Sequence, residues 1–339
     1  MYSLVRPTSS RPPALYRRSL TLACALACVF AFAGPAGASQ LIARDASEIR
    51  LEVNRHGTAL ITYRSNGRLT HLLAWGAINA RFRPAKNVVP QVKFKLDYSG
   101  GWGTYRRLVW KHFENTCRRY DGPKLAWFVR GCKAPDGSYW ALQSWQTALP
   151  DLGFPPWLVM QKKWWLHLSH WRGPLAKLDV YSDWVYSGRW QELFGQYTYK
   201  GHGVRGFGTT RLGAPTDGYG RLVYLDTHNA KAYGRGWHRE NSFVSSGPPG
   251  LFCYGFWPFD PYVGGYAHPP GTPHRKRGPG LGDMYRITAE GFGVTPDVTW
   301  QGAALHPYDP RNQADVELEH RMNAKLDAMR AGWHKCVKH

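Results

Sequence analysis

Hydrophobic and polar residues alternate in the segment that begins near residue 49. Ile49, Leu51 and Val53 are separated by single polar residues, and successive side chains of a strand point to opposite faces, so this segment has one apolar face. Asn66-Gly67 lies between two further alternating runs and is typical of a two-residue β-hairpin. We predict an antiparallel meander with strands at residues 49–54, 58–64, 68–75 and 91–98.

Short apolar or alternating runs continue along most of the remaining chain, and Gly and Pro separate them. Pro135-Asp136-Gly137 lies between two such runs and predicts a hairpin turn. Residues 105–117 fit both a strand period and a helix period, and helix is slightly preferred. Short strands between frequent turns are typical of an antiparallel sandwich or a barrel-like body. The further predicted strands are residues 125–130, 139–145, 164–171, 175–186, 196–199, 221–227, 251–256 and 284–288.

The last part of the chain has a helical period instead. Apolar residues from Leu318 to Trp333 follow one another at steps of four, four, three and four, which places them on one stripe of a helix. Asn312 is a suitable N-cap and Asp315 is favourable in the first turn, so we predict an amphipathic C-terminal α-helix packed on the β body. The predicted organisation is a signal peptide at residues 1–38, a β-rich body at 39–305 with a mobile basic loop near 264–282, and a helix and tail at 306–339.

The first 38 residues have the composition of a cleavable signal peptide. Four arginines and no acidic residue precede an apolar run of 14 residues, Leu20 to Ala33. This run is shorter than the roughly 20 residues that a membrane-spanning helix needs, so we expect no transmembrane span in the mature protein. Ala36-Gly37-Ala38 is a small-x-small site, and we expect cleavage after Ala38. The general secretory route is preferred, while Arg17-Arg18 leaves twin-arginine export open.

Four cysteines remain after residue 38, an even number that indicates disulfide bonds in an exported chain. Three pairings are possible. We prefer a short bridge between Cys117 and Cys132, which closes a polar loop, and a second bridge between Cys253 and Cys336, which ties the C-terminal helix to the β body. A zinc site is the alternative, but no Cys-x-x-Cys pair supports it.

The charge of the chain favours acidic partners. Without the four arginines of the first 38 residues, 40 Lys and Arg remain against 23 Asp and Glu, a net charge of +17. Such a field attracts anionic cell-wall polymers, acidic polysaccharides, lipid head groups or stray nucleic acid, and we expect no specific nucleic-acid partner. A solvated basic surface without any ligand is the competing interpretation, since net charge informs association and not chemistry.

Aromatic side chains next to basic ones are the candidate ligand-binding groups. The chain has 16 tryptophans, and aromatic faces stack on sugar rings while neighbouring cations engage acidic groups. Most of these tryptophans are expected in the core, because Trp is bulky and mainly apolar. The candidates for an exposed platform are Trp164, Trp165, Trp190, Trp237 and Arg189.

One polar cluster is a candidate catalytic site. Asp226, His238, Arg239 and Glu240 supply acid, base and cation within 16 residues, and two carboxylates across a cleft are what glycoside hydrolysis requires. A solvated loop with salt bridges is the preferred interpretation of the same residues. The cluster is kept because acidic residues are scarce in this chain.

Other motifs give no support to catalysis, a metal or a cofactor. His167-x-x-His170 falls in a predicted strand, where residues three apart point to opposite faces and cannot share a metal ion. Gly-x-Gly-x-x-Gly occurs at residues 201–206 in a β context with no helix pattern after it, so dinucleotide binding is not expected. Nucleophile motifs of serine hydrolases are absent from the sequence.

These observations favour a secreted or cell-wall-associated protein that binds polyanionic or carbohydrate polymers without catalysis. The sequence leaves two alternatives open. One is a secreted carbohydrate-active enzyme, either a glycoside hydrolase or a polysaccharide lyase. The other is a structural envelope protein with neither binding nor turnover. The sequence does not determine the oligomeric state.

Overall fold

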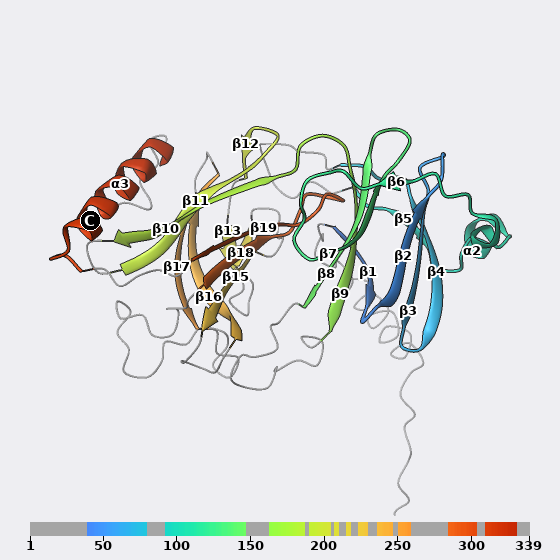
Figure 1. Cartoon of the computed structure of the whole chain (residues 1–339), viewed down its shortest axis with the longest axis horizontal. Coiled ribbons are helices and arrows are strands. Elements are labelled where there is room, and N and C mark those ends of the chain that lie inside the picture. The colour runs from blue at the N-terminus through green and yellow to red at the C-terminus, as the bar shows by residue number, and fades with distance from the viewer. Residues whose placement is uncertain are drawn as a thin grey trace, which may run out of the picture. The chain divides into compact units, whose positions relative to one another are not determined.

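Antiparallel β-strands make up most of the computed structural model, as the alternating sequence predicts (Figure 1). The strands form two sheets that share one core, a third sheet that curls on itself and a small two-stranded sheet. The structure describes residues 39–79, 92–146, 163–186, 190–204, 207–209, 215–217, 223–229, 236–246, 250–258, 284–303 and 309–330.

The predicted meander is confirmed as a four-stranded sheet. Its strands are β2 (Ser47–Val53), β3 (Ala59–Ser65), β4 (Arg68–Trp75) and β5 (Lys95–Asp97), and they pair in chain order. Asn66 and Gly67 both have positive φ, 49° and 74°, which is the backbone that a two-residue hairpin of this hand requires. The turn therefore fixes Ser65 opposite Arg68 at the end of the hairpin.

A five-stranded sheet lies beside this meander in the fold. It contains β1 (Gln40–Arg44), β6 (Arg118–Arg119), β7 (Phe128–Lys133), β8 (Tyr139–Gln146) and β9 (Trp164–Trp171), in the order β1-β9-β8-β7-β6. A hairpin forms around Pro135-Asp136-Gly137 as predicted, although β7 lies three residues later than the predicted 125–130, and the strand at residues 164–171 is as predicted. Strand β1 was not predicted.

The two sheets form a β-sandwich because their inner faces share one buried cluster. Ile61 and Leu72 of the meander and Trp140 and Leu168 of the five-stranded sheet all belong to it and are fully buried. Alternate residues of each strand supply these contacts, as expected for sheets packed face to face. The apolar positions of the predicted meander therefore do face a core.

The third sheet is larger and curved. Its order is β10-β11-β17-β16-β15-β18-β19, with the short β12 paired to β11, and the end strands β10 and β19 lie within 8 Å of each other. Buried residues such as Tyr197, Phe252 and Ile287 fill its inside. The strands are β10 (Lys177–Tyr186), β11 (Trp190–Tyr199), β12 (His202–Gly203), β15 (Val223–Asn229), β16 (Gly236–Ser246), β17 (Leu251–Pro258), β18 (Met284–Ala289) and β19 (Val298–Ala303); β13 (Phe207–Thr209) and β14 (Pro215–Asp217) pair separately.

The loop between β18 and β19 joins the sandwich to the curled sheet. Phe292 belongs to the core of the curled sheet and Val294 to the core of the sandwich. The Val294 carbonyl accepts a hydrogen bond from the His170 amide at 2.7 Å, and Gln143 exchanges hydrogen bonds with the Asp297 backbone at 3.0 and 3.2 Å. These contacts connect residues more than 100 positions apart in the chain.

The predicted C-terminal helix is present as α3 (Gln313–Arg330). Asn312 caps it, since its side-chain oxygen accepts a hydrogen bond from the Ala314 amide at 3.1 Å. Leu326 is buried against Phe194 and Leu251 of the curled sheet. The position of Trp333, at the end of the predicted stripe, lies outside the described residues.

The helix predicted at residues 105–117 is wrong. The segment contains one α-helical turn, α2 (Trp102–Tyr105), and one 3-10 turn, η1 (Val109–His112), followed by extended chain. Arg106 ends α2 because it adopts a left-handed conformation with φ 54°. Residues 236–246, interpreted as a polar loop, form strand β16, and β19 was also missed.

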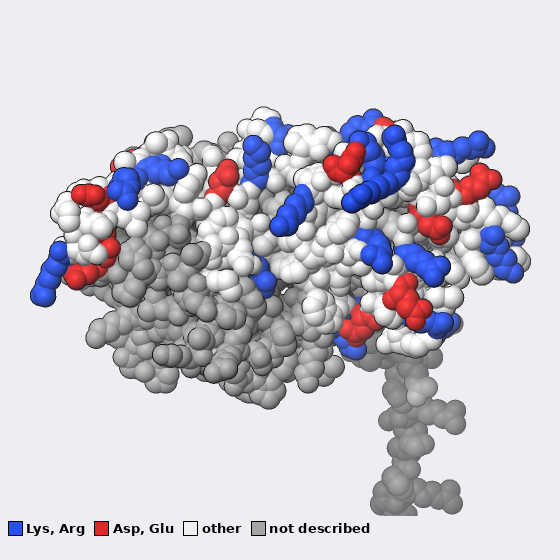
Figure 2. Space-filling model, in the orientation of Figure 1, with Lys and Arg blue, Asp and Glu red and all other residues white. Residues whose placement is uncertain are grey.

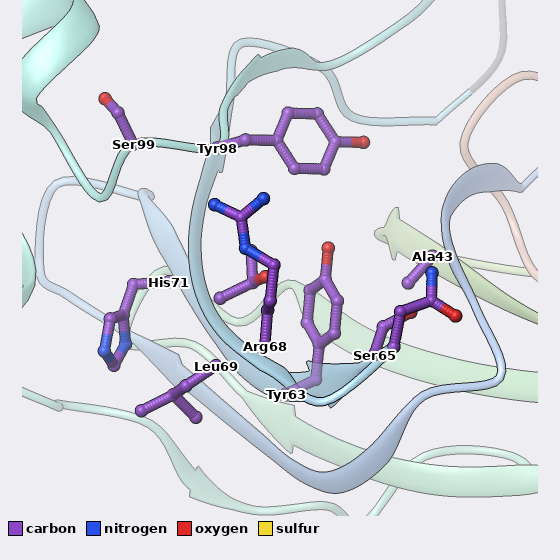
Figure 3. A pocket seen from close by; sticks show the side chains of 10 residues that line it. Ala43, Tyr63, Ser65, Arg68, Leu69, His71, Tyr98 and Ser99 are labelled. Carbon is purple, nitrogen blue, oxygen red and sulfur yellow. The ribbon is translucent and has the colours of Figure 1, made fainter.

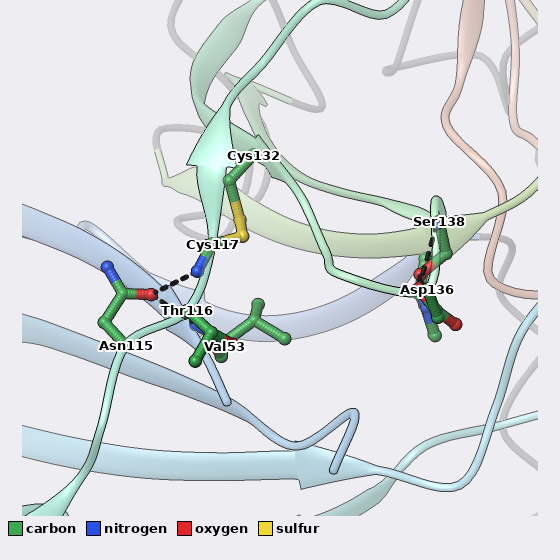
Figure 4. Close-up of a disulfide and its surroundings, with 8 residues drawn as sticks. Val53, Asn115, Thr116, Cys117, Cys132, Asp136 and Ser138 are labelled. Carbon is green, nitrogen blue, oxygen red and sulfur yellow. Dashed lines mark hydrogen bonds between the residues drawn. A yellow bond between two sulfur atoms is a disulfide. The ribbon is translucent and has the colours of Figure 1, made fainter. Parts of the chain in front are cut away.

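The predicted Cys117–Cys132 disulfide is present and links the start of β6 to β7, with the two Cα atoms 5.7 Å apart (Figure 4). Asn115 holds the same segment, since its side-chain oxygen accepts hydrogen bonds from the amides of Val53 and Cys117 at 3.1 and 3.0 Å. The loop that this bridge closes contains β6 and most of β7, which pair at one edge of the five-stranded sheet.

Several predictions concern residues that the structure does not describe. The signal peptide at residues 1–38 and the loop near 264–282 are among them. The backbone of Cys253 lies in β17, but its side chain and Cys336 are outside the description, so this bridge stays a prediction. Among the described helices, none has the length and apolar character needed to cross a membrane.

Candidate functional site

A hollow of about 460 Å³ opens against the β3–β4 hairpin (Figure 3). Strand β4 and the hairpin turn supply most of its wall, Tyr98 and Ser99 after β5 supply another part, and Ala43 of β1 completes it. Pockets for small organic ligands usually have volumes of roughly 300–1,000 Å³. The lining residues are Ala43, Tyr63, Ser65, Asn66, Arg68, Leu69, Thr70, His71, Tyr98 and Ser99.

Arg68 supplies the positive charge of this hollow. The Asn66-Gly67 turn places it at the first position of β4, and its side chain is exposed. Figure 3 shows it between the side chains of Tyr63, His71 and Tyr98. Its guanidinium makes no hydrogen bond or ion pair with any residue that the structure describes. No described residue therefore competes with a ligand for its donors.

Two tyrosines present their rings to the hollow while their hydroxyl groups are held by the backbone. Tyr63 and Tyr98 both donate to the Ile42 carbonyl, at 3.4 and 3.2 Å. Burial raises the pKa of Tyr63 to about 12 and also raises the pKa of Tyr98. The Tyr98 residue is nevertheless 49% exposed, so its hydroxyl end is desolvated while part of its ring faces solvent. Both hydroxyl groups stay protonated near neutral pH and neither is a suitable base.

His71 lies at the other end of the hollow and packs flat on Trp110. The ring centroids are 3.9 Å apart with an interplanar angle of 7°, and Nδ1 lies 3.1 Å from the Thr62 hydroxyl. Burial lowers the pKa of His71 below its ordinary value. The imidazole is therefore neutral near neutral pH, and Arg68 is the charged group of the lining.

The lining of the hollow contains no carboxylate. The nearest acid in sequence is Asp97, whose side chain accepts hydrogen bonds from the amides of Ser99 and Thr104, each at 2.9 Å. Burial acts to raise the Asp97 pKa, but the hydrogen bonds from Ser99 and Thr104 outweigh it and lower the pKa. Asp97 is thus an ionised structural group that shapes the loop beside the hollow. A pair of carboxylates for glycoside hydrolysis is not assembled here.

Two of the predicted aromatic platforms have described side chains. Trp164 is 49% exposed at the start of β9, next to the Lys163–Asp45 ion pair of 2.6 Å. Trp165 is partly buried, and the Arg44 guanidinium lies 5.6 Å from its ring centre. Arg44 follows Ala43 in β1, but successive strand residues point to opposite faces and neither Arg44 nor Trp165 lines the hollow, so this aromatic and basic pair is separate from it. Trp190 and Trp237 are placed only as backbone positions of β11 and β16, and Arg189 lies outside the described residues.

The predicted catalytic cluster lies on β15 and β16. Asp226 is buried and pairs with Arg286 at 3.2 Å, and this guanidinium also lies 5.1 Å from the Trp127 ring centre. The strand register sets Asp226 opposite position 239. Positions 238 and 240 stand opposite Thr227 and Leu225, one residue away on either side, so they belong to the other face of the sheet. Only the backbone of His238, Arg239 and Glu240 is described, and their catalytic role stays a prediction.

The two histidines of the His-x-x-His motif are both buried, on opposite faces of β9. His170 contacts the Ala77 carbonyl at 2.6 Å and the Ser138 hydroxyl at 2.8 Å, while His167 contacts the Ser39 hydroxyl at 2.9 Å. Burial lowers the pKa of each to about 4. They are neutral packing groups. Within the described part of the chain, no group of three or more His, Cys, Asp or Glu could hold a metal ion.

Sequence reasoning did not single out Arg68 or Tyr98. The available signal was the Asn66-Gly67 turn, which predicted the hairpin but not the hollow that forms where β1 and the segment after β5 approach it. Comparison with known proteins adds no further assignment. No protein-family model matches the chain, and neither does any curated protein or solved structure.

Proposed function

We propose that this protein is exported and binds acidic carbohydrate polymers, without catalysis, in the hollow beside Arg68. The observation that carries the proposal is an exposed arginine, without a partner among the described residues, in a hollow that has no carboxylate. An arginine in such surroundings favours an anionic ligand, since no lining acid competes with the ligand for the guanidinium.

The lining suits an acidic sugar in three ways. The planar guanidinium of Arg68 matches a carboxylate, which accepts two parallel hydrogen bonds from it. The exposed part of the Tyr98 ring offers an apolar face to a sugar ring. Ser65, Asn66 and Thr70 line the hollow and carry groups that hydrogen-bond to sugar hydroxyls.

The charge of the surrounding surface supports the same ligand class. Lys and Arg side chains are spread over the face in view, with a dense group above β6 and β7 and others around α2 (Figure 2). A net charge of +17 for the chain after residue 38 attracts polyanions and raises their local concentration. The field of the whole surface attracts acidic polymers, and Arg68 would bind the same polymers in the hollow.

The protonation states of the lining favour binding over turnover. General acid and base catalysis needs groups whose pKa values lie near the working pH. The pKa values of Tyr63 and Tyr98 are raised, so both hydroxyl groups stay protonated, and the His71 ring is held flat on Trp110 with its Nδ1 3.1 Å from the Thr62 hydroxyl. Arg68 remains a fixed cation, which fits a holding role.

The experiment compares retention on two polymers of opposite character. The protein without residues 1–38 is applied to immobilised polygalacturonate, which is acidic, and to dextran, which is neutral. We expect retention on polygalacturonate alone, and we expect Arg68→Ala to weaken it at least about tenfold. Arg50→Ala is the matched control, because Arg50 is an exposed arginine on β2 that does not line the hollow. Equal effects of the two variants, or no retention, would refute the proposal.

A further inference from the structure

Seven consecutive residues after β5, Trp102 to Leu108, are all exposed. Trp102, Tyr105 and Leu108 are the large apolar members, with exposed fractions of 55%, 44% and 38%. Single exposed apolar residues are ordinary, but three within seven positions form a patch of the kind that marks an interaction site. We propose that this segment, the 102–108 loop, docks the protein on an anionic lipid surface.

The local geometry places the apolar side chains together. The Tyr105 amide donates to the Gly101 carbonyl at 2.7 Å and the Arg106 amide to the Trp102 carbonyl at 3.2 Å, so the segment starts with one helical turn. Residues three apart on a helix are surface neighbours, which brings the Trp102 and Tyr105 rings to one side. Leu108 follows three residues after Tyr105, at the start of the 3-10 turn η1.

Hydrogen bonds to the preceding residues Asp97 and Ser99 fix the conformation of the 102–108 loop. The Asp97 carboxylate accepts from the Thr104 amide at 2.9 Å, and the Ser99 hydroxyl accepts from the Gly103 amide at 2.6 Å. Gly101 has φ 111°, and a side chain there would collide with Val109. The loop therefore presents its apolar residues without a further ordering cost, which favours binding.

The charges of the segment fit an anionic surface. Arg106, Arg107 and Lys111 are exposed, and none forms an ion pair with a described residue. Residues 98–113 contain no acid. Basic residues next to a membrane attract anionic headgroups, while Trp and Tyr are enriched at the boundary between headgroups and hydrocarbon.

A lipid surface explains the composition of this loop better than a polysaccharide does. Leu108 has no flat face to stack on a sugar ring, whereas an aliphatic side chain gains from leaving water for hydrocarbon. The loop also differs from the hollow, where a polar lining surrounds one arginine. The inference is independent of the proposed glycan site, although both lie on the meander side of the sandwich.

The test uses the protein without residues 1–38 and two kinds of vesicle, phosphatidylglycerol and phosphatidylcholine, in a sedimentation assay. We expect binding to the anionic vesicles and at least about tenfold weaker binding after the double change Trp102→Ser and Leu108→Ser. Ile78→Ser is the matched control, since Ile78 is an apolar residue with a similar exposed fraction of 40% that lies outside the 102–108 loop and the hollow, and we expect less than a twofold change. Arg106→Gln with Arg107→Gln should reduce the preference for anionic vesicles by about tenfold or more.

Four outcomes would overturn the inference. They are no binding to phosphatidylglycerol vesicles, equal binding to both kinds of vesicle, an equal loss in the Ile78→Ser control, and a Trp102→Ser, Leu108→Ser variant that loses polygalacturonate retention while its vesicle binding is unchanged, which would identify the loop as a glycan platform. Arg68→Ala separates the two proposals, because it should reduce polygalacturonate retention and leave vesicle binding unchanged. Circular dichroism of each variant confirms that the exposed positions do not affect folding.

Discussion

Two tryptophan–histidine stacks of nearly equal geometry occupy opposite environments in this protein. Trp140 and His170 lie inside the sandwich with ring centroids 3.8 Å apart, and Trp110 and His71 lie below the 102–108 loop at 3.9 Å. The first pair is buried and the second is only partly buried. The first stack therefore packs between two neighbouring strands of the five-stranded sheet within the buried core, whereas the second supports an exposed loop and one end of the hollow.

The difference shows that burial, not residue type, assigns the role of an aromatic side chain here. The sequence offers sixteen tryptophans, and neighbouring basic residues were the main signal it gave for separating exposed from buried ones. The structure separates Trp140, which packs in the core, from Trp102, which faces solvent. The protein therefore divides its aromatic side chains between a packing interior and an exposed exterior.

The largest effect is expected from truncating the buried stack. Trp140→Ala should lower the free energy of unfolding by about 3–5 kcal/mol, because it removes a fully buried indole and leaves a cavity between the sheets. Trp110→Ala should cost only about 1–2 kcal/mol, because Trp110 is partly exposed. Urea unfolding of both variants measures the difference. Equal losses would erase the distinction between the two stacks.

The second-largest loss of stability is expected on acidification, because two buried histidines are neutral in the folded protein. The pKa of His167 and of His170 falls from 6.5 in the unfolded chain to about 4 in the fold. Between these two values the unfolded state binds more protons, so stability is complete above pH 6.5 and is lost as the pH falls toward 4. The loss is about 3 kcal/mol for each histidine.

The urea midpoint measured as a function of pH checks this loss. His170→Phe should make the decline between pH 6.5 and 4 shallower, since one of the histidines with a lowered pKa is gone, while His167 and His71 remain. Asp97 does not interfere, because its pKa is lowered below 3.8 and its contribution is lost at still lower pH. A midpoint that stays constant across this window would contradict the assignment of neutral, buried imidazoles.

Loss of the disulfide should have a comparable effect on stability and little effect on the hollow. The bridge closes a loop with a sequence separation of 15, for which chain entropy gives about 3 kcal/mol. Cys117→Ser with Cys132→Ser should reduce the unfolding free energy by that amount while polygalacturonate retention of the folded protein is unchanged. Peptide mapping without reduction should also recover the predicted Cys253–Cys336 bridge, and a Cys117–Cys253 peptide would exclude it.

The smallest stability effect is expected at the exterior positions. Arg68→Ala should change the unfolding free energy by less than about 0.5 kcal/mol. Tyr98→Ala should change it by less than about 1 kcal/mol. Both should nevertheless weaken retention on polygalacturonate, because the two side chains face the hollow. Thermal unfolding and retention are measured on the same samples. A stability loss that accounts for the binding loss would argue against a site.

Local patterns in the sequence predicted much of the fold. The alternation at Ile49, Leu51 and Val53, the turn at Asn66-Gly67 and the stripe of α3 each depend on neighbours a few residues away. Strand β16 was missed because its residues are mainly polar, and pairing with β15 and β17 determines its conformation. The segment after Tyr105 was misassigned because the left-handed conformation of Arg106 has no clear local signature.

The candidate site could not be predicted from local sequence patterns for a similar reason. The hollow is formed by Ala43, the β3–β4 hairpin and Tyr98, which are separated by up to 55 positions in the chain. Conversely, Asp226 and Glu240 are close in sequence, but the register of β15 and β16 assigns them to different faces of the sheet. Proximity along a strand pair therefore does not imply a shared site.

The most direct test of the central claim is the salt dependence of polygalacturonate binding by the unaltered protein and by Arg68→Ala. Exposed charges are screened as ionic strength rises, with a Debye length of about 10 Å at 0.1 M and about 3 Å at 1 M. We predict that affinity of the unaltered protein falls steeply over this range, and that Arg68→Ala binds more weakly at low salt with a shallower decline. Affinity that is indifferent to salt, or an identical decline in both proteins, would contradict the account.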